Sequence, residues 1–376
     1  MNYSPGGYNQ PPENNNPYVN FGPKMPHFVP VEVWLAEKNN IKKLSIFAAI
    51  SILVYIIGSG VFVSIIQTAA SLLSELEGFD YAAFYSKFNS AEFQYLYSAL
   101  YSVLIVGGPF FLLGFLFRKK GVVADIPMGR PLNSKNFPLI IFGCFGVCLA
   151  SNLITSYLTL VFSSVSGIEL GMPEMPETPH SVGGILLFFL STAVVPALIE
   201  EMAIRGVIMQ PLRRYGDWFA IIASAMVFGI MHCNLMQIPF AFTAGIVIGY
   251  AVIVTESVWT GVIIHFLNNA FSVTVSIITD FYGETSVQSV ILNIIFYAVV
   301  IAGCICAVNF YRFKNKKTFY KSPLVNSGNG FFGNVPPFSA KISIGTLLKS
   351  YFLTLPMIVA FGAVVYETIM AIILLQ

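Results

Sequence analysis

Three short motifs place acids, histidines and amides where they could do chemistry together. Residues 200–205 are EEMAIR, residues 228–232 are FGIMH and residues 265–269 are HFLNN. A carboxylate and an imidazole that converge can bind and deprotonate a water molecule. A second imidazole and an amide can donate hydrogen bonds to the oxyanion of a tetrahedral intermediate. Together the motifs predict hydrolysis of an amide bond without a serine or cysteine nucleophile.

Long apolar segments carry these motifs and define the class of protein. Of the 376 residues, 56% are hydrophobic and 10% are charged, and the mean hydropathy is +0.74. Soluble domains carry about 25% charged residues, whereas about 20 consecutive apolar residues cross the hydrocarbon core of a bilayer. The composition excludes a soluble enzyme, a nucleic-acid-binding protein and a secreted disulfide-rich protein. We predict an all-α fold, a polytopic transmembrane helix bundle.

Uninterrupted apolar stretches predict about nine transmembrane helices. They cover approximately residues 44–69, 96–117, 137–162, 183–210, 219–236, 238–255, 258–279, 287–310 and 350–375. Only Gln237 and Pro239 separate the fifth from the sixth. The chain then divides into a disordered cytoplasmic tail at 1–37, two helices with their loops at 38–136, a core with all three motifs at 137–282, and two helices with a basic cytoplasmic loop at 283–376.

The distribution of positive charge predicts the orientation. With a cytoplasmic N-terminus, the inside segments hold 18 of the 20 Lys and Arg residues. Cytoplasmic loops of membrane proteins are enriched in Lys and Arg, so we predict an N-in, C-out topology. The composition, rich in Asn, Lys, Ile and Tyr, favours a bacterial cell membrane as the location of this multi-pass integral membrane protein.

The fourth predicted helix contains charged residues at a depth where charge is costly. Glu201 and Arg205 are four residues apart on one helix face, with the acid first, which is the favourable order for an ion pair. Glu200 lies about 100° away around the helix. Pro196 removes a hydrogen bond to the Thr192 carbonyl and so favours a kink. We therefore expect Glu200 to be an unpaired intramembrane carboxylate and a functional residue.

Two histidines follow in later predicted helices. Helical spacing puts Phe228 and His232 on one face of the fifth helix, and His265 and Asn269 on one face of the seventh. At 1.5 Å per residue from the cytoplasmic ends, Glu200 and these three polar residues lie at depths of about 12 to 21 Å. We expect the four side chains to share one layer near the centre of the bilayer.

The motifs resemble those of a known family. EEMAIR, FGIMH and HFLNN match the EExxxR, FxxxH and HxxxN motifs of the CAAX protease and bacteriocin-processing family of intramembrane glutamate proteases. The resemblance covers roughly residues 140–280. It implies a CAAX-type intramembrane endopeptidase that hydrolyses peptide bonds of a membrane-associated substrate, lipidated or leader-bearing, and it makes residues 137–282 the catalytic core.

The resemblance also implies roles for individual residues. Glu200 would work with His232 to activate water, and His265 and Asn269 would form the oxyanion hole. Phe228, the first residue of its motif, would line the pocket. No cofactor is needed for this chemistry, and the implied partners are a membrane-associated peptide or protein substrate and the lipid bilayer.

A metal-dependent version of the same protease is one alternative. Glu200, His232 and His265 could supply three ligands to a catalytic zinc with an open position. A zinc protease would still need a separate general base. Glu201 is expected to pair with Arg205, and the resemblance gives this pair the role of holding the site together. We therefore favour the metal-free version.

A non-catalytic membrane protein is the alternative of a different class. A bacteriocin-immunity protein could keep the motifs, and intramembrane acids and histidines also form proton relays in carriers. Glu367, in the last predicted helix, has no role in any of these interpretations.

Overall fold

The protein is a bundle of membrane-length helices. The computed structural model describes residues 31–75, 80–118, 125–132, 136–168, 170–171, 176–313, 319, 325–326 and 342–374. Within this part of the chain, eight helices are long and apolar enough to cross a membrane, and Asp217–Ile230 is a shorter apolar helix. The predicted all-α transmembrane bundle is confirmed, and about nine helices is close to the observed number.

The first half of the bundle contains five α-helices and one π-helical segment. These are α1 (Val31–Ser74), α2 (Tyr81–Phe88), α3 (Ala91–Tyr101), the π-helix η1 (Ser102–Gly107), α4 (Gly108–Arg118) and α5 (Phe137–Ser166). The region of the motifs contains α6 (Val182–Phe189), the π-helix η3 (Leu190–Val194), α7 (Val195–Glu201), the π-helix η4 (Met202–Ile208), α8 (Met209–Leu212), the 3-10 helix η5 (Arg213–Tyr215), α9 (Asp217–Ile230), α10 (Gln237–Thr255) and α11 (Val258–Tyr282). The C-terminal part contains α12 (Val287–Phe313), the short parallel strands β1 (Val325–Asn326) and β2 (Ile342–Ser343), α13 (Ile344–Phe352) and α14 (Leu355–Leu374).

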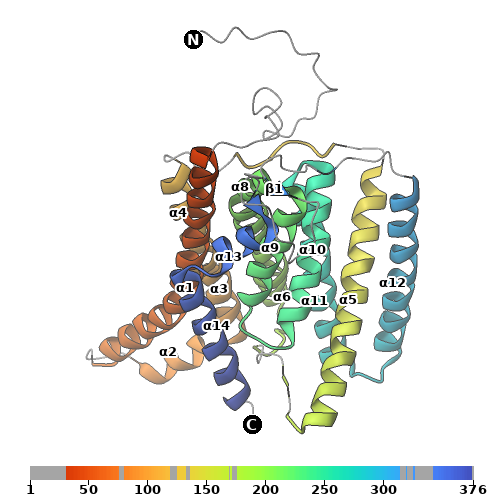
Figure 1. Cartoon of the computed structure of the whole chain (residues 1–376). Helices are drawn as coiled ribbons and strands as arrows, with labels where there is room; N and C mark the ends of the chain where they lie inside the picture. Colours follow the sequence, from red (N-terminus) through yellow and green to blue (C-terminus); the bar gives the residue numbers. More distant parts are fainter. Residues whose placement is uncertain are drawn as a thin grey trace, which may run out of the picture.

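The helices alternate in direction, and the motif-bearing helices lie in the middle of the bundle (Figure 1). α1 and α14 flank one side, and α12 lies at the other, beside α5. The start of α1, α8 and the end of α12 lie at the top of the view, whereas α14 ends at the bottom. The basic segments that begin α1 and follow α8 are therefore at the same end of the bundle, and the assignment of this end to the cytoplasm stays a prediction.

Helix α1 begins at Val31, earlier than composition predicts, so residues 31–37 of the expected tail are helical. The cause is the buried Glu37, which forms an ion pair with Arg214 and accepts a hydrogen bond from the Tyr215 hydroxyl at 3.2 Å. These contacts fix the first turns of α1 to the end of the motif-bearing helix. The rest of the predicted tail lies outside the described residues.

The prediction of a helix over 219–236 is wrong at its end. Helix α9 stops at Ile230, and residues 231–236 form a turn before α10. The backbone reverses at Cys233, whose φ is +49°. His232 therefore lies in this turn and not on a helix.

The last predicted helix, 350–375, is also interrupted. Helix α13 ends at Phe352 and α14 begins at Leu355. Pro356 is the second residue of α14, a position where its missing N–H leaves no helical hydrogen bond unmade. The membrane-length part is α14 alone.

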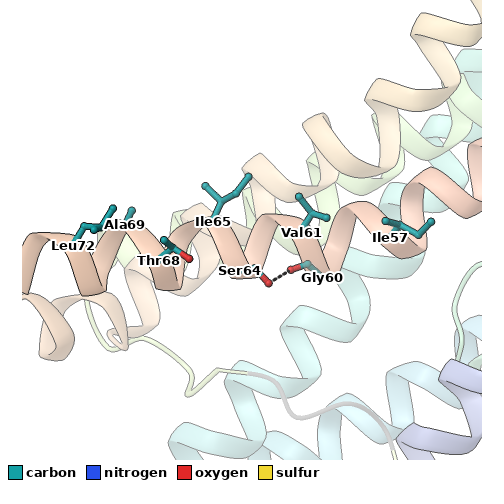
Figure 2. Close-up of a pocket in the computed structure, with 8 residues that line it drawn as sticks. All are labelled: Ile57, Gly60, Val61, Ser64, Ile65, Thr68, Ala69 and Leu72. Atoms are coloured by element: carbon teal, nitrogen blue, oxygen red, sulfur yellow. Dashed lines mark hydrogen bonds between the residues drawn. The ribbon is translucent and has the colours of Figure 1, made fainter.

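An open groove follows the C-terminal half of α1. A cavity of about 740 Å³ runs along this helix and is lined by Ile57, Gly60, Val61, Ser64, Ile65, Thr68, Ala69 and Leu72. Figure 2 shows these side chains along α1 and the hydrogen bond from the Ser64 hydroxyl to the Gly60 carbonyl at 2.8 Å. No ionisable side chain and no motif residue lines this groove, so it is not the predicted active site.

The topology can be tested with alkaline phosphatase fusions, because this enzyme needs disulfides that form only outside the cytoplasm. We expect a fusion after residue 313 to be inactive and a fusion after Gln376 to be active in intact bacterial cells. Equal expression of the two fusions on an immunoblot is the control. The opposite pattern of activity would contradict the N-in, C-out topology.

Candidate active site

The first motif lies in a helical span, Val182–Tyr215, with irregular winding. The π-helical segments η3 and η4 flank α7, which contains Pro196 and ends at Glu201. Pro196 has no N–H to donate to the Thr192 carbonyl four residues earlier. Asn269 of α11 donates to that carbonyl instead, with 3.1 Å between Nδ2 and the oxygen. This hydrogen bond connects the third motif to η3, in the same helical span that carries the first motif.

Glu201 is the centre of a buried charge cluster. Its Oε1 lies 2.8 Å from Arg205 Nη1 and 2.9 Å from His265 Nδ1. Glu201 and Arg205 are both 0% exposed, so each would be very costly without the other. Arg205 also donates to the Gly245 carbonyl of α10 at 3.3 Å. The cluster therefore connects η4 and α7 to α10 and α11.

The aromatic ring of Phe228 connects this cluster to the second motif. The Arg205 guanidinium carbon lies 4.6 Å from the ring centroid, which is cation–π geometry. The rings of His232 and His265 meet Phe228 edge-on, with centroids 5.0 Å and 5.8 Å away. Phe228 thus lies against both histidines and the arginine.

The hydrogen bonds of the two histidines determine which ring nitrogen stays available. His232 Nδ1 lies 2.8 Å from the Phe228 carbonyl oxygen, which can only accept, so Nδ1 donates. In the neutral ring Nε2 then carries the lone pair and can act as a base. His265 Nδ1 donates to the Glu201 carboxylate, so its Nε2 can donate a hydrogen bond only when the ring is protonated.

Asn234 holds the turn that carries His232, and the motifs alone do not identify it. Its Oδ1 accepts from the backbone N–H groups of Met236 and Gln237, at 2.9 Å and 3.1 Å. Its Nδ2 donates to the Gly171 carbonyl at 3.0 Å. An Asn just before a helix whose first turn contains a proline is a helix-start signal. This signal marks the true start of α10.

Glu200 and His232 line the same cavity, which has a volume of about 260 Å³. Its walls come from α1, η1, α4, α7, η4, α9, α10 and the turn between α9 and α10. The lining residues are Tyr55, Val106, Phe110, Glu200, Ala203, Ile204, Phe228, Met231, His232 and Gln237. Within the described part of the chain, the half-buried Glu200 carboxylate makes no hydrogen bond or ion pair. The cavity therefore holds an unpaired acid and an imidazole.

The structure does not place the other two predicted site residues in the lining of this cavity. His265 contacts Glu201 and Phe228, behind the cavity wall that Phe228 forms. Asn269 donates to Thr192, and its Oδ1 accepts from Asn268 at 3.3 Å. Glu200 and His232 therefore share the cavity, Glu201, Arg205 and His265 form the buried cluster, and Asn269 is hydrogen-bonded to neither group.

The alternative zinc site does not fit this arrangement. A catalytic zinc needs about three protein ligands close together. Among the described residues, no three His, Cys, Asp or Glu side chains gather closely enough to hold a metal ion. Glu200 and His232 line one cavity, whereas His265 is not among its lining residues.

A family model matches the region of these motifs. Residues 182–271 match the model described as type II CAAX prenyl endopeptidase Rce1-like. The matched segment begins in α6, ends in α11 and contains all three motifs. The match confirms the resemblance to the CAAX protease family over this segment. No curated protein and no solved structure matches the chain.

Gly261 of α11 tests the packing around Glu201. A Cβ at this position would lie 2.8 Å from Glu201 Oε2 and 2.9 Å from Val252 Cγ2. The carboxylate cannot move away without losing Arg205 and His265. We expect Gly261→Ala to destabilise the fold by about 1–3 kcal/mol, the cost of an overpacked core, and to lower the unfolding temperature in detergent.

Gly183→Ala is the matched control, because a Cβ at this position of α6 meets nothing within 4 Å. We expect its unfolding temperature to stay the same or to rise, since Ala favours helix more than Gly. Equal unfolding temperatures for the two variants would contradict the tight packing of α11 against Glu201.

Proposed function

We propose that the protein is an intramembrane endopeptidase that hydrolyses a peptide bond of a membrane-associated substrate, lipidated or leader-bearing. The observation that carries this proposal is the cavity shared by Glu200 and His232. The family match, which predicts CAAX-type endopeptidase activity, supports it. The charge asymmetry and composition support a location in a bacterial cell membrane.

Glu200 and His232 activate the attacking water in this proposal. The carboxylate has no competing partner among the described residues, and His232 Nε2 carries a lone pair when the ring is neutral. The pair takes a proton from water as its oxygen adds to the carbonyl carbon. The same proton then passes to the amine leaving group as the C–N bond breaks.

We assign the stabilisation of the oxyanion to His265 and Asn269, as in the family. Asn269 Nδ2 has two N–H groups and uses one on Thr192, so the second remains for the substrate. The Glu201 carboxylate, fixed by Arg205, accepts from His265 Nδ1 and so orients the His265 ring. Glu201 and Arg205 are therefore positioning residues.

A single-residue test compares two intramembrane carboxylates. We expect Glu200→Gln to lower cleavage of a fluorescence-quenched farnesylated CAAX peptide by the purified protein at least about 100-fold, because the general base is lost. Glu367→Gln in α14 is the control and should keep wild-type activity. An active Glu200→Gln variant would contradict the mechanism and favour a non-catalytic role such as bacteriocin immunity.

Metal removal provides a separate test. The cavity uses water activation by side chains, so we expect peptide cleavage to continue after dialysis against EDTA. Metal analysis of the same sample should find less than one equivalent of zinc. Loss of activity that zinc alone restores would favour the metal-dependent alternative.

A further inference from the structure

The cavity contains two polar side chains that no motif includes, Tyr55 and Gln237. Tyr55 comes from α1 and is hydrogen-bonded to Tyr101, against whose ring it packs edge-on. Gln237 is the first residue of α10, and its backbone N–H donates to Asn234 Oδ1 at 3.1 Å. In the part of the chain that the structure describes, the Gln237 side-chain amide makes no hydrogen bond.

An unpaired amide inside a membrane protein is unfavourable, because it has lost water without gaining another partner. Gln237 is half-buried and faces a space that also holds Glu200 and His232. Its Nε2 carries two N–H donors, whereas the Glu200 carboxylate and the free nitrogen of neutral His232 are acceptors. The group that would pair with Gln237 is therefore an acceptor brought by the substrate.

We propose that Gln237 Nε2 donates a hydrogen bond to the carbonyl oxygen of the scissile peptide bond. This proposal rests on the proposed endopeptidase function and adds a catalytic residue to it. Water adds to the carbonyl carbon, the carbonyl π electrons move to the oxygen, and Gln237 stabilises the oxygen as it becomes negative. When the C–N bond breaks, the carbonyl re-forms and the amine departs with the proton taken from water.

The position of Gln237 favours this role over that of His265 and Asn269 acting alone. Neither of those residues lines the cavity, whereas Gln237 shares it with both members of the water-activating pair. Asn234 fixes the N–H of Gln237 and is itself anchored to Gly171. One turn therefore carries both His232 and Gln237 and fixes the backbone from which the Gln237 amide enters the cavity, in keeping with the preorganised donors that electrostatic stabilisation requires.

The test uses the purified full-length protein and the quenched farnesylated CAAX peptide. Gln237→Leu removes both donors and keeps a similar side-chain volume. Loss of one oxyanion-hole donor lowers kcat about 100- to 1,000-fold, so we expect a fall of this size with KM nearly unchanged. Asn293→Leu, the same kind of change at an exposed position of α12 outside this cavity, should keep wild-type kcat.

A second readout separates a catalytic from a structural role. A phosphinate analogue of the same peptide resembles the tetrahedral intermediate, so its inhibition constant should rise by the same factor as kcat/KM falls. Gln237→Glu keeps the shape of the side chain, and an ionised carboxylate cannot donate. This variant should lose as much activity and unfold at the wild-type temperature.

Each outcome has a distinct meaning. Wild-type kcat in Gln237→Leu or Gln237→Glu would overturn the role of Gln237 and leave the endopeptidase function intact. Loss of kcat without a matching loss of phosphinate affinity would also overturn it. A wild-type protein that cleaves no peptide would instead refute the proposed function, and the role of Gln237 with it.

Discussion

The buried charge of Glu201 is the constraint on which the rest of the site depends. A carboxylate and a guanidinium with no exposed surface are stable only as a pair with further hydrogen bonds, and the structure supplies them from three helices. Arg205 contacts Glu201, the Gly245 carbonyl and the Phe228 ring, while His265 contacts Glu201. Both contacts to the acid use Glu201 Oε1, whereas the neighbouring Glu200 carboxylate makes no hydrogen bond or ion pair among the described residues.

The short turn between α9 and α10 is the second determinant of the site. If residues 231–236 were helical, α9 and α10 would form one continuous helix and His232 would lie within it. The side chain of Asn234 stabilises the turn instead, and the positive φ of Cys233 reverses the backbone. As a result an imidazole and an amide from one short segment line the same cavity as the carboxylate that α7 provides.

Spacing within one helix was enough to predict the local contacts. The four-residue interval between Glu201 and Arg205 gave their pairing, and the interval between Phe228 and His232 gave their contact even though α9 ends before His232. Contacts between helices could not be predicted this way. The bond between Glu201 and His265 depends on how α7 and α11 pack, and Tyr55 reaches the cavity from a helix outside every motif. The hydrophobicity pattern did not predict the end of α9, because apolar residues continue through the turn. Hydrophobicity alone does not distinguish a helix from a turn between two helices.

We propose that Glu200 and His232 activate water to cleave a membrane-associated protein or peptide. Comparison of membrane-protein termini in cells that carry the wild-type chain or Glu200→Gln tests it most directly, because it requires no assumption about the substrate. We predict at least one new pair of termini that occurs with the wild type and is absent with the variant at equal expression. Identical sets of termini in the two strains would contradict it.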